Sequence, residues 1–228
     1  ALVYLVPTFH NPTGLVVPAH RRLELLAVAR RRGLTVVEDD AYTDVCFEPD
    51  AMPRSIAGLA DYRGVFRLGT FSKSLAPGIR LGWLATDAGT ATRMAQSAMF
   101  TSGGGLNHLA AVAVTGMIEC GGYDRHLGWL REQLRLRRDA LVTVLRAQLP
   151  EDFDIACPAG GFFVWVRPPA WCAETELVAA AERAGVPVAG GIRFGNRSGS
   201  AVRLCFSFHA PKLLAEAAHR LASCWLGG

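Results

Sequence analysis

A single lysine lies among hydroxyl side chains in the stretch from Gly69 to Gly82. Lys73 follows Thr70 and Ser72, and Arg80 comes a few residues later. A desolvated amine beside another cation loses its proton more easily and becomes a nucleophile that can form a Schiff base. Hydroxyl groups and a guanidinium are also the donors that bind a phosphate group well.

An imine-forming lysine beside a phosphate cradle predicts a site for pyridoxal phosphate. The alternative interpretation is a surface loop whose lysine and arginine are simply solvated, as charges in loops commonly are. The stretch by itself leaves both interpretations open, so the elements that must position it become important.

The composition is that of a well-cored soluble protein. The chain has 228 residues, of which 50% are hydrophobic and 19% are charged. This excludes a disordered chain and allows one large domain, or one and a half ordinary ones. The net charge of +4 is small and its basic residues are scattered, which does not indicate nucleic-acid binding but is compatible with an anionic small ligand.

Cysteine usage indicates a reducing compartment. The six cysteines are scattered, form no C-x-x-C pair and are not clustered with histidine, at positions 46, 120, 157, 172, 205 and 224. We therefore expect no metal site, no disulfide framework and a cytoplasmic location. The uncharged run 94–118 is interrupted by polar residues and glycines, which favours two buried helices joined by a glycine turn over a membrane span.

The first half of the chain alternates apolar runs with helical patterns. Strands are expected at 2–6, 34–37, 65–68 and 81–85, and helices at 18–32, 89–100 and 106–120. The first strand is a continuous apolar run, as expected for a buried parallel strand. The strand–helix–strand unit at its start predicts a right-handed crossover and a parallel sheet.

The acids Glu38, Asp39 and Asp40 follow the second strand. Ligands of open α/β sheets bind at this carboxyl end of the strands.

The pattern changes in the second half. A long helix is expected at 123–149, with a leucine stripe at helical spacing. Strands at 162–166, 186–189 and 201–208 and helices at 174–184 and 212–225 then predict a compact α+β domain. We expect one domain over 1–122, and the linking helix with a second, small domain over 123–228.

Three further features accompany the Lys73 stretch: Asn11-Pro12-Thr13-Gly14, Asp39-Asp40-Ala41-Tyr42 and Arg203 in an apolar strand. Each alone is weak, because such residues are commonly a turn, a helix cap and an edge charge. Together and in this order they resemble the fold-type-I, pyridoxal-phosphate-dependent aminotransferases of class I and II.

The resemblance covers nearly the whole chain and includes Gly160-Gly161-Phe162, which is similar to a strand of the family's small domain. The stretches Glu38–Tyr42 and Phe71–Gly78 resemble those of the branch that contains 2-aminoadipate and kynurenine aminotransferases. It implies an α/β fold, with residues 1–122 as the C-terminal part of the cofactor-binding large domain, built on a mostly parallel sheet. Residues 123–228 would be the linking helix and the C-terminal α+β small domain.

The resemblance implies cofactor roles for seven residues. Lys73 would carry pyridoxal phosphate as a Schiff base and then act as the general base and acid. Asp39 would pair with the pyridinium nitrogen and keep it protonated. The remaining cofactor-binding residues would be Asn11 and Tyr42 at the ring oxygen, and Thr70, Ser72 and Arg80 at the phosphate.

Substrate roles follow from the same resemblance. Arg203 would bind the α-carboxylate of an amino acid in a bidentate pair, and Asn11 would be a second substrate-binding residue. The implied reaction is transfer of an amino group between an amino acid and a 2-oxo acid, in a homodimer, with no metal and no membrane. Cys205, and Val188 to Gly191, depart from the family pattern.

Two expectations remain beside this one. The family's N-terminal section has no counterpart here, so we expect a fragment that could be inactive alone. The related alternative is the effector domain of a MocR-type regulator of the GntR family, in which case nucleic acid would be a partner. The intact Asn11 favours the enzyme, and Phe9-His10 leans toward the regulators.

Overall fold

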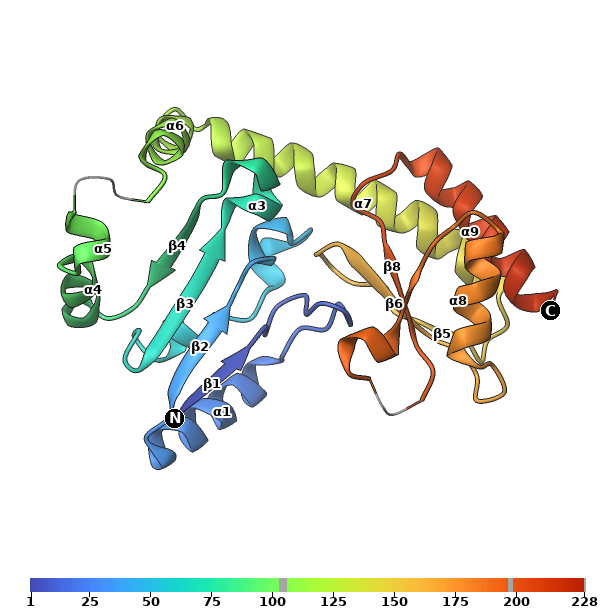
Figure 1. Ribbon diagram of the computed structural model, residues 1–228, viewed down its shortest axis with the longest axis horizontal. Coiled ribbons are helices and arrows are strands. Elements are labelled where there is room, and N and C mark those ends of the chain that lie inside the picture. Colours follow the sequence, from blue (N-terminus) through green and yellow to red (C-terminus); the bar gives the residue numbers. More distant parts are fainter. Residues whose placement is uncertain (103–105, 197–198, 228) are drawn as a thin grey trace. The chain divides into compact units, whose positions relative to one another are not determined.

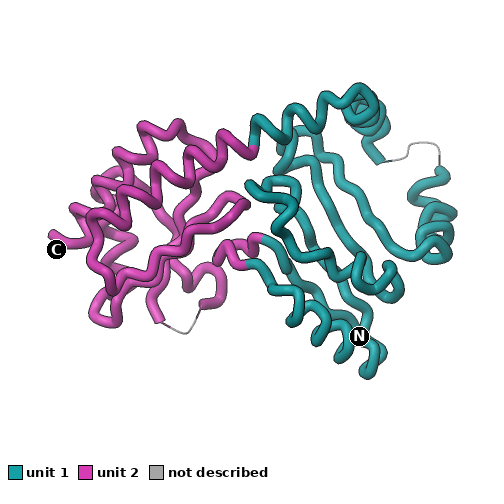
Figure 2. Tube along the Cα trace, turned by 180° about the vertical axis from the view of Figure 1, so that it is seen from behind, with its two compact units in different colours: residues 1–8, 16–130 teal, residues 9–15, 131–228 magenta. Residues whose placement is uncertain are grey.

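The computed structural model describes residues 1–102, 106–196 and 199–227 (Figure 1). The chain divides into two compact units, coloured separately in Figure 2. Unit 1 contains residues 1–8 and 16–130, and unit 2 contains residues 9–15 and 131–228. The expected domains over 1–122 and 123–228 stay a prediction.

Unit 1 is built on a four-stranded sheet in the order β1-β2-β3-β4. Its strands are β1 (Leu2–Leu5), β2 (Thr35–Asp39), β3 (Val65–Thr70) and β4 (Gly82–Ala85). The first three strands are parallel, and α1 (Ala19–Arg32) connects β1 to β2, which confirms the predicted strand–helix–strand unit and a mostly parallel sheet. β4 is antiparallel to β3. The link between them, residues 71–81, is shorter than the connections that usually join parallel strands.

One side of this sheet carries the core of unit 1. Leu26 and Ala29 of α1 pack with Val36, Val65 and the short helix α2 (Ile56–Leu59). The expectation that β1 is buried on both faces is wrong, because alternate residues leave the core: Leu2 and Tyr4 are 65% and 57% exposed.

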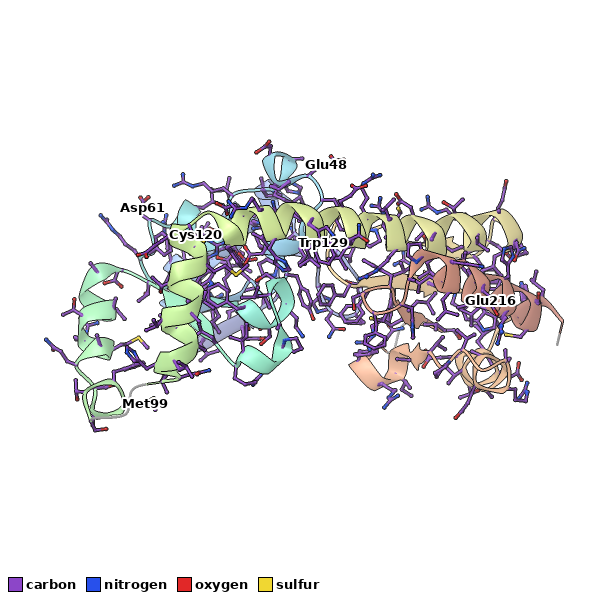
Figure 3. All side chains as sticks on the ribbon, turned by 90° about the horizontal axis from the view of Figure 1, so that it is seen from above. Glu48, Asp61, Met99, Cys120, Trp129 and Glu216 are labelled. Atoms are coloured by element: carbon purple, nitrogen blue, oxygen red, sulfur yellow. The ribbon has the colours of Figure 1, made fainter. Side chains whose placement is uncertain are left out.

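The remaining helices of unit 1 follow β3 and β4. They are α3 (Phe71–Ser74), α4 (Ala88–Ala95), α5 (Ala98–Thr101), α6 (His108–Glu119) and the start of α7 (Gly122–Gln148). The single helix expected at 89–100 is divided into α4 and α5, and the expected glycine turn at 103–105 lies outside the described residues. The expectation that these helices are buried is wrong: in the described part of the chain, α4 and α5 have no buried residue, and in α6 only Val114 is buried. Met99 in α5 and Cys120 after α6, both labelled in Figure 3, are exposed. Within the described ranges, no helix combines the length and apolar character needed to cross a membrane.

In its described residues, unit 2 consists of an antiparallel sheet, the later part of α7, two further α-helices and the 3₁₀ turn η4 (Gly191–Phe194). The strands run in the order β5 (Asp154–Ile155), β6 (Phe163–Arg167), β8 (Val202–Cys205) and β7 (Ala189–Gly190). The two further α-helices are α8 (Glu174–Arg183) and α9 (Pro211–Leu226). The predicted leucine stripe is buried in α7, where Leu134, Leu141 and Leu145 are at most 2% exposed. β5 was not predicted, since two residues give no periodic signal.

The segment 9–15 packs within unit 2 although β1, directly before it, belongs to unit 1. Phe9 is buried, and a Cβ on Gly161 would lie 2.8 Å from its Cβ. A Cβ on Gly14 would lie 3.1 Å from the carbonyl oxygen of Phe163. Both glycines have φ near +70°, so close approach and backbone conformation together require glycine.

A buried ion pair fixes the end of β1 in unit 1. Nη1 of Arg22, in α1, lies 3.8 Å from Oε1 of Glu38, in β2, and the two side chains are 1% and 0% exposed. Arg22 donates to the carbonyl of Pro7 and to Thr8 Oγ1, and Glu38 accepts from the backbone N–H groups of Ile56 and Ala57. The pair therefore links β1, α1, β2 and the start of α2.

We expect Glu38→Ala to lower the free energy of unfolding by about 3–5 kcal/mol, because it leaves a buried guanidinium without its carboxylate. Urea denaturation followed by circular dichroism measures this change. The control is Glu24→Ala, which breaks the exposed Arg21–Glu24 pair and should cost under about 1 kcal/mol. Equal midpoints for the two variants would contradict the prediction.

Candidate active site

Lys73 lies in the short helix α3, directly after β3, and not in an open loop. Thr70 caps this helix, since its Oγ1 accepts from the backbone N–H of Ser72 at 3.1 Å. The Lys73 side chain is half-buried, and its Nζ lies 5.8 Å from the centre of the Tyr42 ring, within range of a cation–π contact. Tyr42 is buried and precedes the 3₁₀ turn η1 (Thr43–Val45).

Hydroxyl and guanidinium donors gather beside the Lys73 turn. Arg80 Nη1 lies 3.5 Å from Ser72 Oγ, and Thr70 contributes a second hydroxyl from the same turn. Arg80 has φ of +52°, which is uncommon for a residue with a side chain. Asn107 holds this backbone by donating to the carbonyl of Ile79 at 2.6 Å and that of Arg80 at 3.3 Å. The donor set fits a phosphate group.

The three consecutive acids of the β2 end lie on different faces. Successive side chains of a strand alternate, so Glu38 and Asp40 share one face and Asp39 lies on the other. Asp40 is buried and paired with Arg67, whose Nη2 lies 2.5 Å from its Oδ2. Glu38 is committed to Arg22 and the start of α2. Asp39 is therefore the acid of this group that stands apart from the buried ion pairs.

Tyr4 is a neighbour of Asp39 that the sequence analysis missed. Its hydroxyl donates to Asp39 Oδ2 across the parallel pair β1–β2, while Asp39 Oδ1 accepts from the N–H of Ala41 at 3.3 Å. The hydrogen bond to Asp39 is the main cause that raises the pKa of Tyr4 to about 12. In the register of β1 and β2, Tyr4 lies opposite Val37, two residues before Asp39. Knowledge of this register would have revealed the contact, but the motifs do not define the register.

Unit 2 brings Asn11 and Arg203 together although 192 residues separate them. Arg203 Nη1 donates to Asn11 Oδ1 at 2.8 Å. The Arg203 guanidinium lies 4.2 Å from the ring centre of Phe163 and 4.5 Å from that of Phe194. It therefore contacts two aromatic rings. Cation–π contacts of this kind hold the plane of a guanidinium. Phe194 carried no signal in the sequence.

The predicted site residues therefore form two groups, one in each unit. In unit 1, Lys73 lies near Tyr42, and Ser72 near Arg80. In unit 2, Arg203 contacts Asn11. The chemical roles expected for these residues stay predictions.

Comparison with known proteins identifies relatives of two kinds. The family model described as aminotransferase class I and II matches residues 2–221. The 2-aminoadipate transaminase of Thermus thermophilus is 32% identical over 99% of this chain and 57% of that protein. An uncharacterized HTH-type transcriptional regulator of Bacillus subtilis, YisV, is 38% identical over 72% of this chain and 34% of that protein.

A solved structure supports the fold along the chain. The kynurenine aminotransferase of Pyrococcus horikoshii, determined in complex with PMP, superposes with a TM-score of 0.87 at 31% identity. The match covers 98% of this chain and 55% of that one. The chain thus spans between about one third and three fifths of the lengths of these three proteins.

The Tyr4–Asp39 hydrogen bond predicts that Tyr4 titrates late. Tyrosine ordinarily ionises near pH 10, so we expect Tyr4 to ionise near pH 12, later than an ordinary tyrosine. Because the folded pKa is raised, the stabilisation is complete below about pH 10 and is lost as the pH rises through 12. A titration of the tyrosinate absorbance against pH measures the pKa of Tyr4.

Tyr4→Phe should lower the absorbance change near pH 12 by the amplitude of one tyrosine. A wild-type titration that is complete by about pH 11, or a late absorbance change of equal amplitude in Tyr4→Phe and wild type, would refute the assignment.

Proposed function

The chain belongs to the aminotransferase class I and II family, and from that premise we propose that it is part of a pyridoxal-phosphate-dependent aminotransferase. The reaction would move an amino group between an amino acid and a 2-oxo acid. The arrangement that supports this proposal is the Lys73 turn, with Ser72 and Arg80 3.5 Å apart beside it. Because the chain spans about half the length of the aminotransferases it matches, the activity of the whole protein is a proposal.

The residues of unit 1 have the chemistry that the cofactor needs. When bound, pyridoxal phosphate supplies an aldehyde that condenses with amines and a ring that withdraws electrons from the substrate Cα. Thr70, Ser72 and Arg80 would hold its phosphate through hydroxyl and guanidinium donors. Nζ of Lys73 would hold the aldehyde carbon and later move the proton of the substrate Cα–H bond.

Asp39 and Tyr42 would fix the ring. Asp39 keeps a carboxylate outside the buried ion pairs of Glu38 and Asp40, so its negative charge is the one suited to hold a proton on the pyridine nitrogen. Tyr42 and Asn11 would donate hydrogen bonds to the ring oxygen. The support for Tyr42 is its short distance from Lys73 Nζ.

Arg203 would bind the substrate. Its planar fork matches a carboxylate, and Asn11 with Phe163 and Phe194 holds it in one orientation. Binding of the α-carboxylate orients the Cα–H bond for cleavage, which is a contribution of alignment. We also propose a homodimer and a cytoplasmic location, on the family resemblance and the scattered free cysteines.

Lys73→Ala should abolish the covalent cofactor in the full-length protein. The expected result is loss of the visible absorbance of the lysine-bound form and loss of a borohydride-trapped adduct, because no other amine is placed in this turn. Lys212→Ala, in α9 of unit 2, is the matched control and should keep both signals. A trapped adduct that persists in Lys73→Ala would show that another lysine carries the cofactor.

Arg203→Ala should lower kcat/KM for amino acids by on the order of 10²–10³, mainly through KM, because a charged bidentate contact is lost. The cofactor absorbance should stay unchanged. Arg183→Ala, an exposed arginine of α8, is the control and should behave as wild type. Unchanged kinetics in Arg203→Ala would assign the carboxylate to another residue.

A second candidate function is the effector domain of a transcriptional regulator. The observation that favours it is the 38% identity to YisV, above the 32% identity to the T. thermophilus transaminase. The experiment loads the full-length protein with pyridoxal phosphate, adds amino acids and 2-oxo acids, and measures new 2-oxo acid and DNA binding. Turnover without DNA binding supports the enzyme; DNA binding that responds to the cofactor, without turnover, supports the regulator.

A further inference from the structure

Tyr123, in the first turn of α7, contacts both short segments that carry the proposed cofactor residues of unit 1. Its hydroxyl lies 2.7 Å from Ser74 Oγ and 2.8 Å from Asp44 Oδ2. Ser74 directly follows Lys73 in α3, and Asp44 lies two residues after Tyr42, in η1. Figure 1 shows α3 close to the first turns of α7.

The chemistry of the three groups orders the hydrogens between them. A carboxylate only accepts, so the Tyr123 hydroxyl donates to Asp44, and the Ser74 hydroxyl then donates to the Tyr123 oxygen. Ser74 is fully buried, where an unmade hydrogen bond is costly. The hydrogen bond to Asp44 is charge-assisted and hence the stronger of the two.

Two further contacts from the same region of α7 reach α3. The Tyr123 ring meets the Phe71 ring edge-on, with centres 5.7 Å apart and planes at 74°. His126 lies one turn later on the same face, and its Nε2 is 3.0 Å from the carbonyl oxygen of Ser74. The first and last residues of α3 are therefore both held by α7, with Lys73 between them.

This support matters because α3 is only four residues long. A single helical turn is marginal by itself, since few hydrogen bonds offset the ordering of its backbone. The lysine side chain is a flexible four-carbon stem, so the position of Nζ depends on the backbone that carries it. A displacement of about 1 Å at a reacting group can cost on the order of 10²-fold in rate.

We propose that Tyr123 is a positioning residue that joins the Lys73 turn to the Tyr42 turn through its hydrogen bonds to Ser74 and Asp44. The inference rests on the proposed function, because the position of Lys73 matters when it holds the cofactor. Tyr123 acts through its neighbours and does not itself touch the reacting atoms.

The test compares Tyr123→Phe with wild type in the full-length protein. Phenylalanine keeps the ring against Phe71 and removes the hydroxyl. We expect pyridoxal phosphate to bind roughly three- to tenfold more weakly, as for loss of one or two net hydrogen bonds. The pH midpoint of the cofactor absorbance should also shift. Without cofactor, amide hydrogen exchange should rise in the segments 71–76 and 42–46 and not elsewhere.

Two comparisons make the result specific. Asp44→Asn keeps an oxygen that can accept from Tyr123 but removes the charge, so its effect should lie between wild type and Tyr123→Phe. Tyr62→Phe is the matched control, since Tyr62 packs against the core cluster around Val36 and Val65. It should leave cofactor affinity and exchange at 71–76 unchanged.

The outcomes separate the two proposals. Wild type that binds no pyridoxal phosphate overturns the proposed function and this inference with it. Wild type that binds, with Tyr123→Phe unchanged in affinity, pH midpoint and local exchange, overturns the inference alone. Exchange that rises throughout unit 1 also overturns it, because Tyr123 would then stabilise the fold in general and not the Lys73 turn.

Discussion

The structure of unit 1 depends on a guanidinium that is removed from water. Arg22 is 1% exposed, and its charge is compensated by Glu38, by the carbonyls of Val17, Pro7 and Arg54, and by Thr8. Burying two charges costs several kcal/mol per ion, so these partners must all be present for the pair to be tolerated. Burial raises the pKa of Glu38, while its two backbone hydrogen bonds favour the carboxylate. Satisfying this one group fixes where β1 ends and how α1, β2 and α2 meet.

Side chains of β2 alternate between its two faces, so the acids of the ion pairs lie on one face and Asp39 lies on the other. Glu38 faces the buried Arg22 and Asp40 faces the partly buried Arg67, whereas Asp39 faces Tyr4. A shift of one residue in the register of β2 would exchange these faces, leaving two buried charges without partners. The buried pairs therefore hold Asp39 in register on its own face of β2. They achieve this without touching it.

Local signals in the sequence predicted the parallel strands, α1 and the leucine stripe of α7, because periodicity and helix ends are encoded by neighbouring residues. The family resemblance predicted Lys73, Arg80, Asn11 and Arg203 as a set. It could not predict Tyr4, Asn107 or Tyr123, whose partners lie far away in the chain and whose types occur in any protein. The apolar pattern located the strand at 81–85 but assigned it no direction; β4 is antiparallel to β3.

The enzyme and the regulator need different parts of this chemistry. A protein that only senses pyridoxal phosphate needs a Schiff-base lysine and phosphate donors, and the residues that we propose for these roles lie in unit 1. Turnover also needs a substrate carboxylate held in one orientation. Arg203, which we propose for this role, lies in unit 2, where Asn11, Phe163 and Phe194 contact its guanidinium. Ordering an arginine costs side-chain entropy and desolvation, which an anionic ligand offsets. A pre-oriented Arg203 is thus the feature that a cofactor sensor would have least reason to keep, and it favours the aminotransferase.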